Sequence, residues 1–166
     1  MDKNFFRVVS SAATREHDKY HILKYLDEDV SFKDVTEDIC CLGLFGPKSR
    51  EMISKISNDD FSNDEFKFGT GKFIMINGVK VWAQRLSYVG ELGFELYVDS
   101  SLAKDLYEIL IEEGKNFELS HCGMHAMDIM RMESGFVHWG HDISPEENQY
   151  QACLLYTSDA ADEKVR

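Results

Sequence analysis

The sequence predicts an α+β domain in which helices flank an antiparallel sheet. Two apolar runs, residues 72–76 and 79–87, are separated only by Asn77 and Gly78. That dipeptide suits the two-residue type I′ turn of a β-hairpin, because both of its residues adopt positive φ angles readily. Residues 93–98 alternate in polarity and add a third strand. Segments with helical spacing stand before and after these strands, a combination that defines the α+β class.

The first segment predicts a strand followed by a helix. Residues 5–10 are rich in aromatic and β-branched side chains and predict a β-strand. Thr14 is placed to cap a helix that runs through Leu26. Residues 27–33 are polar and form a connection. The apolar residues expected to give this helix a partly buried stripe are Tyr20, Ile22, Leu23 and Leu26.

The next segment predicts a second strand and a second helix. Residues 39–45 form a nearly unbroken apolar run, which indicates a buried strand. Gly46 stops this strand, and Pro47 suits the first position of a helix that ends near Ile56. Residues 58–64 predict an acidic loop that leads to the hairpin.

Two further helices are expected after the third strand. Ser100 or Ser101 starts the first, and Gly114 stands where a C-terminal cap belongs. Residues 125–134 predict the last helix, which Gly135 closes. The apolar residues that recur at helical spacing in the first of these helices are Leu102, Leu106, Ile109 and Leu110.

Composition restricts the possible partners and the compartment. The net charge of −12 and the pI near 4.8 disfavour nucleic acid and anionic membranes, because both would repel the chain. The longest apolar run, residues 39–46, is far shorter than the ~20 residues that span a bilayer. The N-terminus shows no signal-peptide pattern, and adjacent Cys40 and Cys41 are poorly placed to pair. We therefore expect a reducing compartment, the cytoplasm or, in a eukaryote, the mitochondrial matrix.

A two-glycine corner is the most informative stretch for function. Gly90 and Gly93 lie between two β-prone runs and permit a sharp bend. Tyr88 stands before the bend and Glu95 after it, so a corner here could bring a phenol and a carboxylate together. A carboxylate accepts two parallel hydrogen bonds and suits a flat heterocycle with adjacent N–H donors. The alternative is a solvent-facing Glu95 beside a tyrosine at the edge of the core.

Three motifs carry a resemblance to a known family. Residues 88–97, Tyr-Val-Gly-Glu-Leu-Gly-Phe-Glu-Leu-Tyr, resemble the signature of the folate-binding aminomethyltransferase (glycine-cleavage T-protein) family. Residues 46–50, Gly-Pro-Lys-Ser-Arg, resemble the start of one of its helices. Residues 123–142 resemble another helix followed by Trp-Gly-x-Asp. The same module forms the C-terminal part of FAD-dependent dimethylglycine and sarcosine dehydrogenases.

The resemblance implies a partial domain. Residues 1–152 correspond to part of the folate-binding aminomethyltransferase-like domain, so we expect a fragment of a longer protein. Residues 153–166 resemble a translated sequencing-adapter end, and we expect them to be a non-native tail. An ordinary polar tail is the alternative.

The resemblance also implies a tetrahydrofolate site. By position, Glu95 would hydrogen-bond the pterin ring and Tyr88 would flank it, while Leu96 and Tyr97 would line it in the dehydrogenase branch. The family's catalytic aspartate belongs to a segment before Phe5. No catalytic residue is therefore assigned here, and the fragment alone is expected to be inactive.

Departures from the family pattern favour one branch. Met127 stands where the glycine-cleavage enzyme has an arginine that contacts folate, and His138-Trp139-Gly140 is similar to the dehydrogenase pattern. We therefore expect a dimethylglycine/sarcosine dehydrogenase-like enzyme acting on an N-methylated amino acid. An upstream flavin domain holding FAD would form an iminium, whose carbon this domain would pass to tetrahydrofolate as 5,10-methylenetetrahydrofolate.

Two alternatives remain open. The chain could belong to the glycine-cleavage aminomethyltransferase itself, which takes its carbon from a lipoyl-bound aminomethyl group. It could also belong to a catalytically silent regulatory homologue that shares the module. The sequence contains no dinucleotide-binding Gly-x-Gly-x-x-Gly fingerprint, so FAD is not expected on this chain.

Other clusters near the end of the chain are weighed against structural roles. The His and Cys residues between 121 and 141 lack a typical zinc pattern, and no metal is expected. Trp139 suits either a core anchor or a ligand contact. Asp128 and Arg131 are i,i+3 neighbours on the last helix, and we expect them to pair in structural support.

Overall fold

The computed structural model describes residues 4–148 and 150–152, and it divides into two compact units, Met1–Glu37 and Asp38–Arg166. The tail expected from residue 153 onward lies outside the described residues. Each unit is considered by itself. In the described part of the chain, no helix is both long and apolar enough to cross a membrane.

The first unit contains one α-helix, α1 (Arg15–Tyr25), preceded by the 3₁₀ turn Ala12–Thr14. The predicted helix is confirmed, but the strand predicted for residues 5–10 is wrong. This stretch has no regular structure, and Phe6 is 84% exposed. Apolar, β-branched composition forms a strand only where a neighbouring strand supplies hydrogen bonds, and the first unit has no other strand in its described residues.

The packing of α1 also differs from expectation. Tyr20 and Leu23 are 70% and 50% exposed, so the partly buried stripe is wrong for both of them. The Thr14 hydroxyl donates to Asp18 Oδ2 at 2.7 Å, and the Thr14 side chain makes no capping hydrogen bond at the start of α1. Arg15 instead links the helix to the following segment through ion pairs with Asp34 and Glu37.

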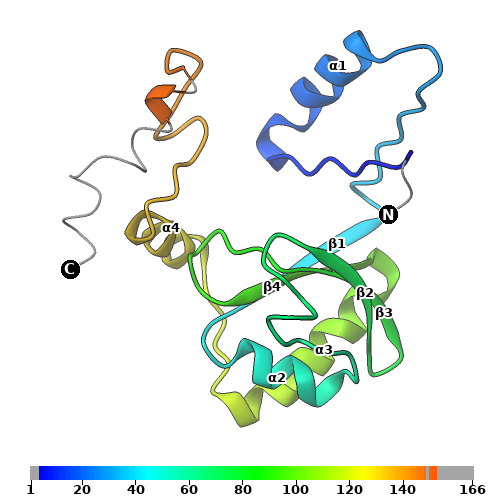
Figure 1. Cartoon of the computed structure of the whole chain (residues 1–166), viewed down its shortest axis with the longest axis vertical. Coiled ribbons are helices and arrows are strands. Elements are labelled where there is room, and N and C mark those ends of the chain that lie inside the picture. Colours follow the sequence, from blue (N-terminus) through cyan, green and yellow to red (C-terminus); the bar gives the residue numbers. More distant parts are fainter. Residues whose placement is uncertain (1–3, 149, 153–166) are drawn as a thin grey trace. The chain divides into compact units, whose positions relative to one another are not determined.

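The second unit is organised around a four-stranded antiparallel sheet (Figure 1), which confirms the α+β prediction. Its strand order is β1-β4-β3-β2, so the first strand lies beside the last. The four strands are β1 (Ile39–Phe45), β2 (Gly71–Ile76), β3 (Val79–Gln84) and β4 (Gly93–Asp99).

The predicted hairpin joins β2 and β3. Asn77 and Gly78 have φ angles of 44° and 88°, the positive values that a type I′ turn requires. Strand β1 matches the predicted residues 39–45, but Leu44 is its one fully buried member. It lies at an edge of the sheet, so the expectation of a fully buried strand is wrong.

Helices α2 (Ser49–Ile56) and α3 (Ala103–Gly114) lie together against one face of the sheet (Figure 1). Between them and the sheet is an apolar core to which every strand contributes alternate residues. Phe61 and Phe66, from the connection between α2 and β2, each place their ring centroid 5.5 Å from that of Phe94. The core includes Leu44, Ile53, Ile74, Val81, Leu96 and Leu106.

Two helix ends differ from the predictions. Helix α2 begins at Ser49, with Pro47 in the preceding turn. Gly114 does not cap α3, because its φ is −57° and a 3₁₀ turn follows it; Glu118 takes the left-handed conformation instead. A Cβ at Gly114 would lie 2.6 Å from Leu119 Cβ, so this glycine permits close packing.

The last helix, α4 (Met124–Glu133), is confirmed within one residue at each end. Gly135 follows it with a φ of 77°, and its amide donates to the carbonyl of Met132 at 3.0 Å. This left-handed glycine is the predicted end signal. It directs residues 136–142 back toward the two-glycine corner.

Candidate functional site

The two-glycine corner joins two of the motifs through one backbone oxygen. The Leu92 carbonyl accepts from the amide of Gly46 at 2.8 Å and from the hydroxyl of Ser49 at 3.1 Å. Residues 46–50 therefore hold the end of the corner against the start of α2. Gly93 is needed here because a Cβ would lie 2.5 Å from the carbonyl oxygen of Leu44.

The other side of the corner docks on the end of α4. The Ser134 hydroxyl donates to the carbonyl of Val89 at 3.2 Å, and Val89 is buried. Gly90 has a φ of 77°, and a Cβ there would lie 2.7 Å from Ser134 Cβ. The first glycine of the motif thus provides both a left-handed turn and a close approach between the corner and α4.

The predicted site residues on strand β4 lie on two different faces of the sheet. Leu96 is 0% exposed and belongs to the core beneath α2 and α3, so its side chain cannot line a site on the opposite face. Glu95 and Tyr97 lie on that opposite face. The Tyr97 hydroxyl donates to Glu95 Oε2 at 2.6 Å, so the structure brings these two predicted residues together.

We call this opposite surface the outer face, and its side chains come from all four strands. Cys41 and Trp82 are the cross-strand neighbours of Tyr97, while Gly43 and Gln84 are those of Glu95. Phe73 packs edge-on against Trp82 with ring centroids 4.9 Å apart. The outer face includes Cys41, Phe45, Phe73, Trp82, Gln84, Glu95 and Tyr97.

The electrostatics of the outer face keep its neutral groups protonated. Burial, together with the hydrogen bond to Glu95, raises the pKa of the Tyr97 phenol well above its usual value. Burial and the nearby charge of Glu95 raise the pKa of the Cys41 thiol to about 11. Tyr97 therefore acts as a donor to Glu95 at physiological pH, and Cys41 is a weak nucleophile.

Tyr88 contacts the segment that follows α4. Its ring lies nearly parallel to that of Phe136, with centroids 6.4 Å apart and an interplanar angle of 17°. The ring of His138 meets it edge-on at 6.5 Å. These contacts position Tyr88, and its convergence with Glu95 on one ligand stays a prediction.

A buried arginine holds that segment in place. Arg131 is 3% exposed and its Nε lies 2.7 Å from Asp128 Oδ1, which confirms the predicted i,i+3 pair. It also pairs with Asp142 and donates to the carbonyl of Phe136 at 3.0 Å. The His138 amide and Arg131 both lower the pKa of Asp142. The Trp-Gly-x-Asp motif thus contributes Asp142 to a structural network.

Trp139 is 56% exposed, so the core-anchor interpretation is wrong. The rings of His138 and His141 lie 4.9 Å apart, and His121 Nε2 is 2.8 Å from the Tyr107 hydroxyl. Within residues 4–148 and 150–152, no group of three or more His, Cys, Asp or Glu side chains could hold a metal ion.

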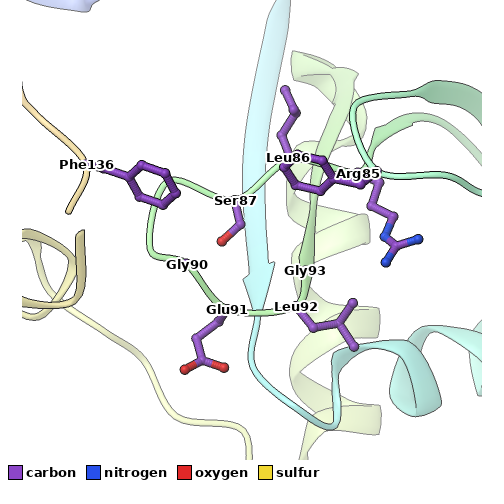
Figure 2. Close-up of a pocket in the computed structure, with 9 residues that line it drawn as sticks. Arg85, Leu86, Ser87, Gly90, Glu91, Leu92, Gly93 and Phe136 are labelled. Carbon is purple, nitrogen blue, oxygen red and sulfur yellow. The ribbon is translucent and has the colours of Figure 1, made fainter. Parts of the chain in front are cut away.

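A hollow of about 300 Å³ lies along the corner (Figure 2). Its lining includes motif residues 90–93, with Arg85 and Phe136 at its sides. Figure 2 shows the side chains of Arg85 and Glu91 on opposite sides of the corner. Neither Tyr88 nor Glu95 is among the residues that line this hollow.

Sequence reasoning missed the neighbours of Glu95 on the outer face. Gln84 and Cys41 come from strands that only the sheet order places beside β4. Phe45 was assigned to a buried strand, although it is odd-numbered like Cys41 and shares its face. The period-two alternation of residues 39–45 was the available signal, and the uniform apolar composition of the run concealed it.

The fold and this polar cluster define an α+β domain with a carboxylate on an outer sheet face. The chain belongs to the GCVT N-terminal domain family, a family of folate-dependent aminomethyltransferase-type domains, whose model matches residues 1–160. This confirms the resemblance carried by the three motifs.

Three relatives illustrate the range of the family. A 4-methylaminobutanoate oxidase (formaldehyde-forming) of Paenarthrobacter nicotinovorans is 40% identical over 75% of this chain and 15% of that protein. Mitochondrial dimethylglycine dehydrogenase of Homo sapiens is 31% identical over 91% of this chain and 18% of that protein. An aminomethyltransferase of Thermoanaerobacter sp. (strain X514) is 29% identical over 91% of this chain and 41% of that protein. The chain spans less than half the length of each of these relatives.

Proposed function

We propose that this chain is the tetrahydrofolate-binding one-carbon transfer module of a dimethylglycine/sarcosine dehydrogenase-like flavoenzyme. It would accept the carbon of an iminium derived from an N-methylated amino acid, give 5,10-methylenetetrahydrofolate and release the demethylated amino acid. The observation that carries this proposal is the half-buried Glu95 carboxylate, which the Tyr97 hydroxyl holds on the outer face of the sheet.

Glu95 and its hydrogen-bonded neighbour Tyr97 fit the pterin part of the folate. A pterin presents an amino group and a ring N–H as adjacent donors, and a carboxylate has about four acceptor positions. Tyr97 uses one position on Oε2. The carboxylate therefore has capacity for the paired donors, in the bidentate arrangement that gives strong and directional recognition.

The chemistry assigned to this chain is binding and orientation. Tetrahydrofolate supplies the nucleophilic nitrogen that takes up the one-carbon unit. Glu95 would fix the pterin edge, Tyr97 would fix Glu95, and the packed Tyr88 would flank the ring. Such positioning lowers the barrier because the two reactants no longer need to find each other in solution. We assign no catalytic residue to this chain, and we place FAD on another part of the full-length polypeptide.

Similarity to an oxidase and to a dimethylglycine dehydrogenase favours the flavoenzyme branch, as does Met127 in place of arginine. The glycine-cleavage aminomethyltransferase is the second candidate. Turnover of an N-methylated amino acid by the full-length polypeptide separates these functions. Release of formaldehyde that falls when tetrahydrofolate is added supports the proposal, and release that folate does not change contradicts it.

We place the reaction in the cytoplasm or the mitochondrial matrix.

The direct test is titration of tetrahydrofolate into the full-length polypeptide and its Glu95→Gln variant. Glutamine keeps the size of the side chain but loses the charge and one acceptor. We expect binding to weaken by about 1.5–3 kcal/mol, the range of hydrogen bonds to charged groups. Glu91→Gln is the matched control, because it removes the same charge from an exposed position of the same motif. Equal losses in both variants, or no loss in either, would contradict a specific role of Glu95.

A further inference from the structure

Phe45, the last residue of β1, occupies an unusual place on the outer face. Its ring fills the space above two glycines, one on its own strand and one on β4. A Cβ at Gly43 would lie 2.5 Å from Phe45 Cε2, and a Cβ at Gly93 would collide with Phe45 Cδ1 of the same ring. Any side chain at either glycine would displace this ring.

Both glycines are neighbours of Glu95. Gly43 is its direct cross-strand partner, and Gly93 precedes it by two residues on the same face. Directly opposed residues in an antiparallel pair have Cβ positions about 4.5–5.5 Å apart. The Phe45 ring therefore lies beside the carboxylate-bearing side chain, in the space that two ordinary side chains would otherwise fill.

The ring is half-buried, and the alternation of β1 places it on the outer face. It provides an apolar aromatic surface on one side of Glu95, while Tyr97 fixes the carboxylate from the other side along β4. An aromatic surface next to an acceptor carboxylate matches a flat heterocycle, which offers π faces together with N–H donors at its edge.

We propose that Phe45 is a further ligand-contacting residue of this site, and that its ring packs against the heterocycle whose N–H groups Glu95 accepts. The proposal rests on the proposed function, since it takes the ligand of Glu95 to be a reduced pterin. It assigns a second role to the glycine that closes the motif: besides allowing the turn, Gly93 leaves room for this ring.

The test measures binding of two probes to the full-length polypeptide: tetrahydrofolate, and 6-methyltetrahydropterin, which is the heterocycle without its tail. The variant Phe45→Leu keeps apolar volume and removes the aromatic ring. We expect both probes to bind about 3- to 10-fold more weakly, the range for loss of an aromatic pair. Phe45→Tyr should bind both within about twofold of the unchanged protein, since it retains the ring.

Phe73→Leu is the matched control, because Phe73 is an exposed aromatic of the same face on β2. It should leave both affinities unchanged. Gly43→Ala should weaken binding of both probes as Phe45→Leu does, since the new methyl group displaces the Phe45 ring while Phe45 and Glu95 themselves remain. Circular dichroism and thermal melting establish that each variant is folded.

The outcomes separate this inference from the proposed function. Unchanged binding in Phe45→Leu together with a loss in Glu95→Gln would overturn the role of Phe45 and leave the folate site intact. A loss for tetrahydrofolate but not for 6-methyltetrahydropterin would also overturn it, because the contact would then be with the tail. Unchanged binding in both variants would overturn the folate site itself.

Discussion

Replacing Gly90 with alanine should destabilise the second unit for two separable reasons. The first is conformational: φ is 77° at this position, and a left-handed residue with a Cβ costs about 1–2 kcal/mol. The second is steric: the new Cβ would lie 2.7 Å from Ser134 Cβ and nearer still to its hydroxyl. Overpacking of this kind costs about 1–3 kcal/mol, so we expect a total loss of about 2–5 kcal/mol.

The chain offers a control that isolates the conformational part. Gly69 also has a φ of 77°, but a Cβ there would meet nothing within 4 Å. Gly69→Ala should therefore cost about 1–2 kcal/mol in urea unfolding. Adding Ser134→Gly to Gly90→Ala should recover most of the difference between the two alanine variants. Equal losses in Gly69→Ala and Gly90→Ala would refute the close packing of the corner on α4.

Two further predictions concern the outer face. Tyr97→Phe should weaken tetrahydrofolate binding when it is the only substitution, but it should have little additional effect in the Glu95→Gln variant, because Tyr97 acts through Glu95. Additive losses in this double-mutant cycle would contradict that role. Cys41 and Cys122 are both exposed, but alkylation of Cys41 at pH 8 should be slow compared with that of Cys122, because the pKa of Cys41 is raised to about 11. Glu95→Gln should accelerate it, since removing a nearby negative charge lowers the thiol pKa, whereas mass spectrometry showing no change at Cys41 would contradict the proximity of the two side chains.

Local sequence signals predicted the elements of the second unit well because each signal acts within a few residues. Asn77-Gly78 dictates a turn, and Gly135 ends α4 through its own φ angle. The prediction for residues 5–10 was wrong because strand formation depends on a partner that composition does not reveal. Gly114 shows a similar limit: its role comes from Leu119, which packs against it after a 3₁₀ turn.

The candidate site was predictable only in part. The motif identified Glu95 and Tyr97, and alternation alone placed them on one face. Leu96 was included by position in the family motif, although the same alternation directs it into the core. The place of Phe45 near Glu95 depends on the pairing of β1 with β4, which joins residues about fifty positions apart. Pairing between strands so distant in sequence leaves no local pattern to read.

The alternation of β4 has a consequence for how this domain tolerates change. Phe94, Leu96 and Val98 support the helices, while the residues interleaved with them present the carboxylate and the phenol. Insertion or deletion of a single residue within this strand would exchange the two sets, so that Glu95 would enter the apolar core and Leu96 would be exposed to solvent. Length variation in the strand should therefore be far more damaging than substitution, because stability and recognition would fail in one event.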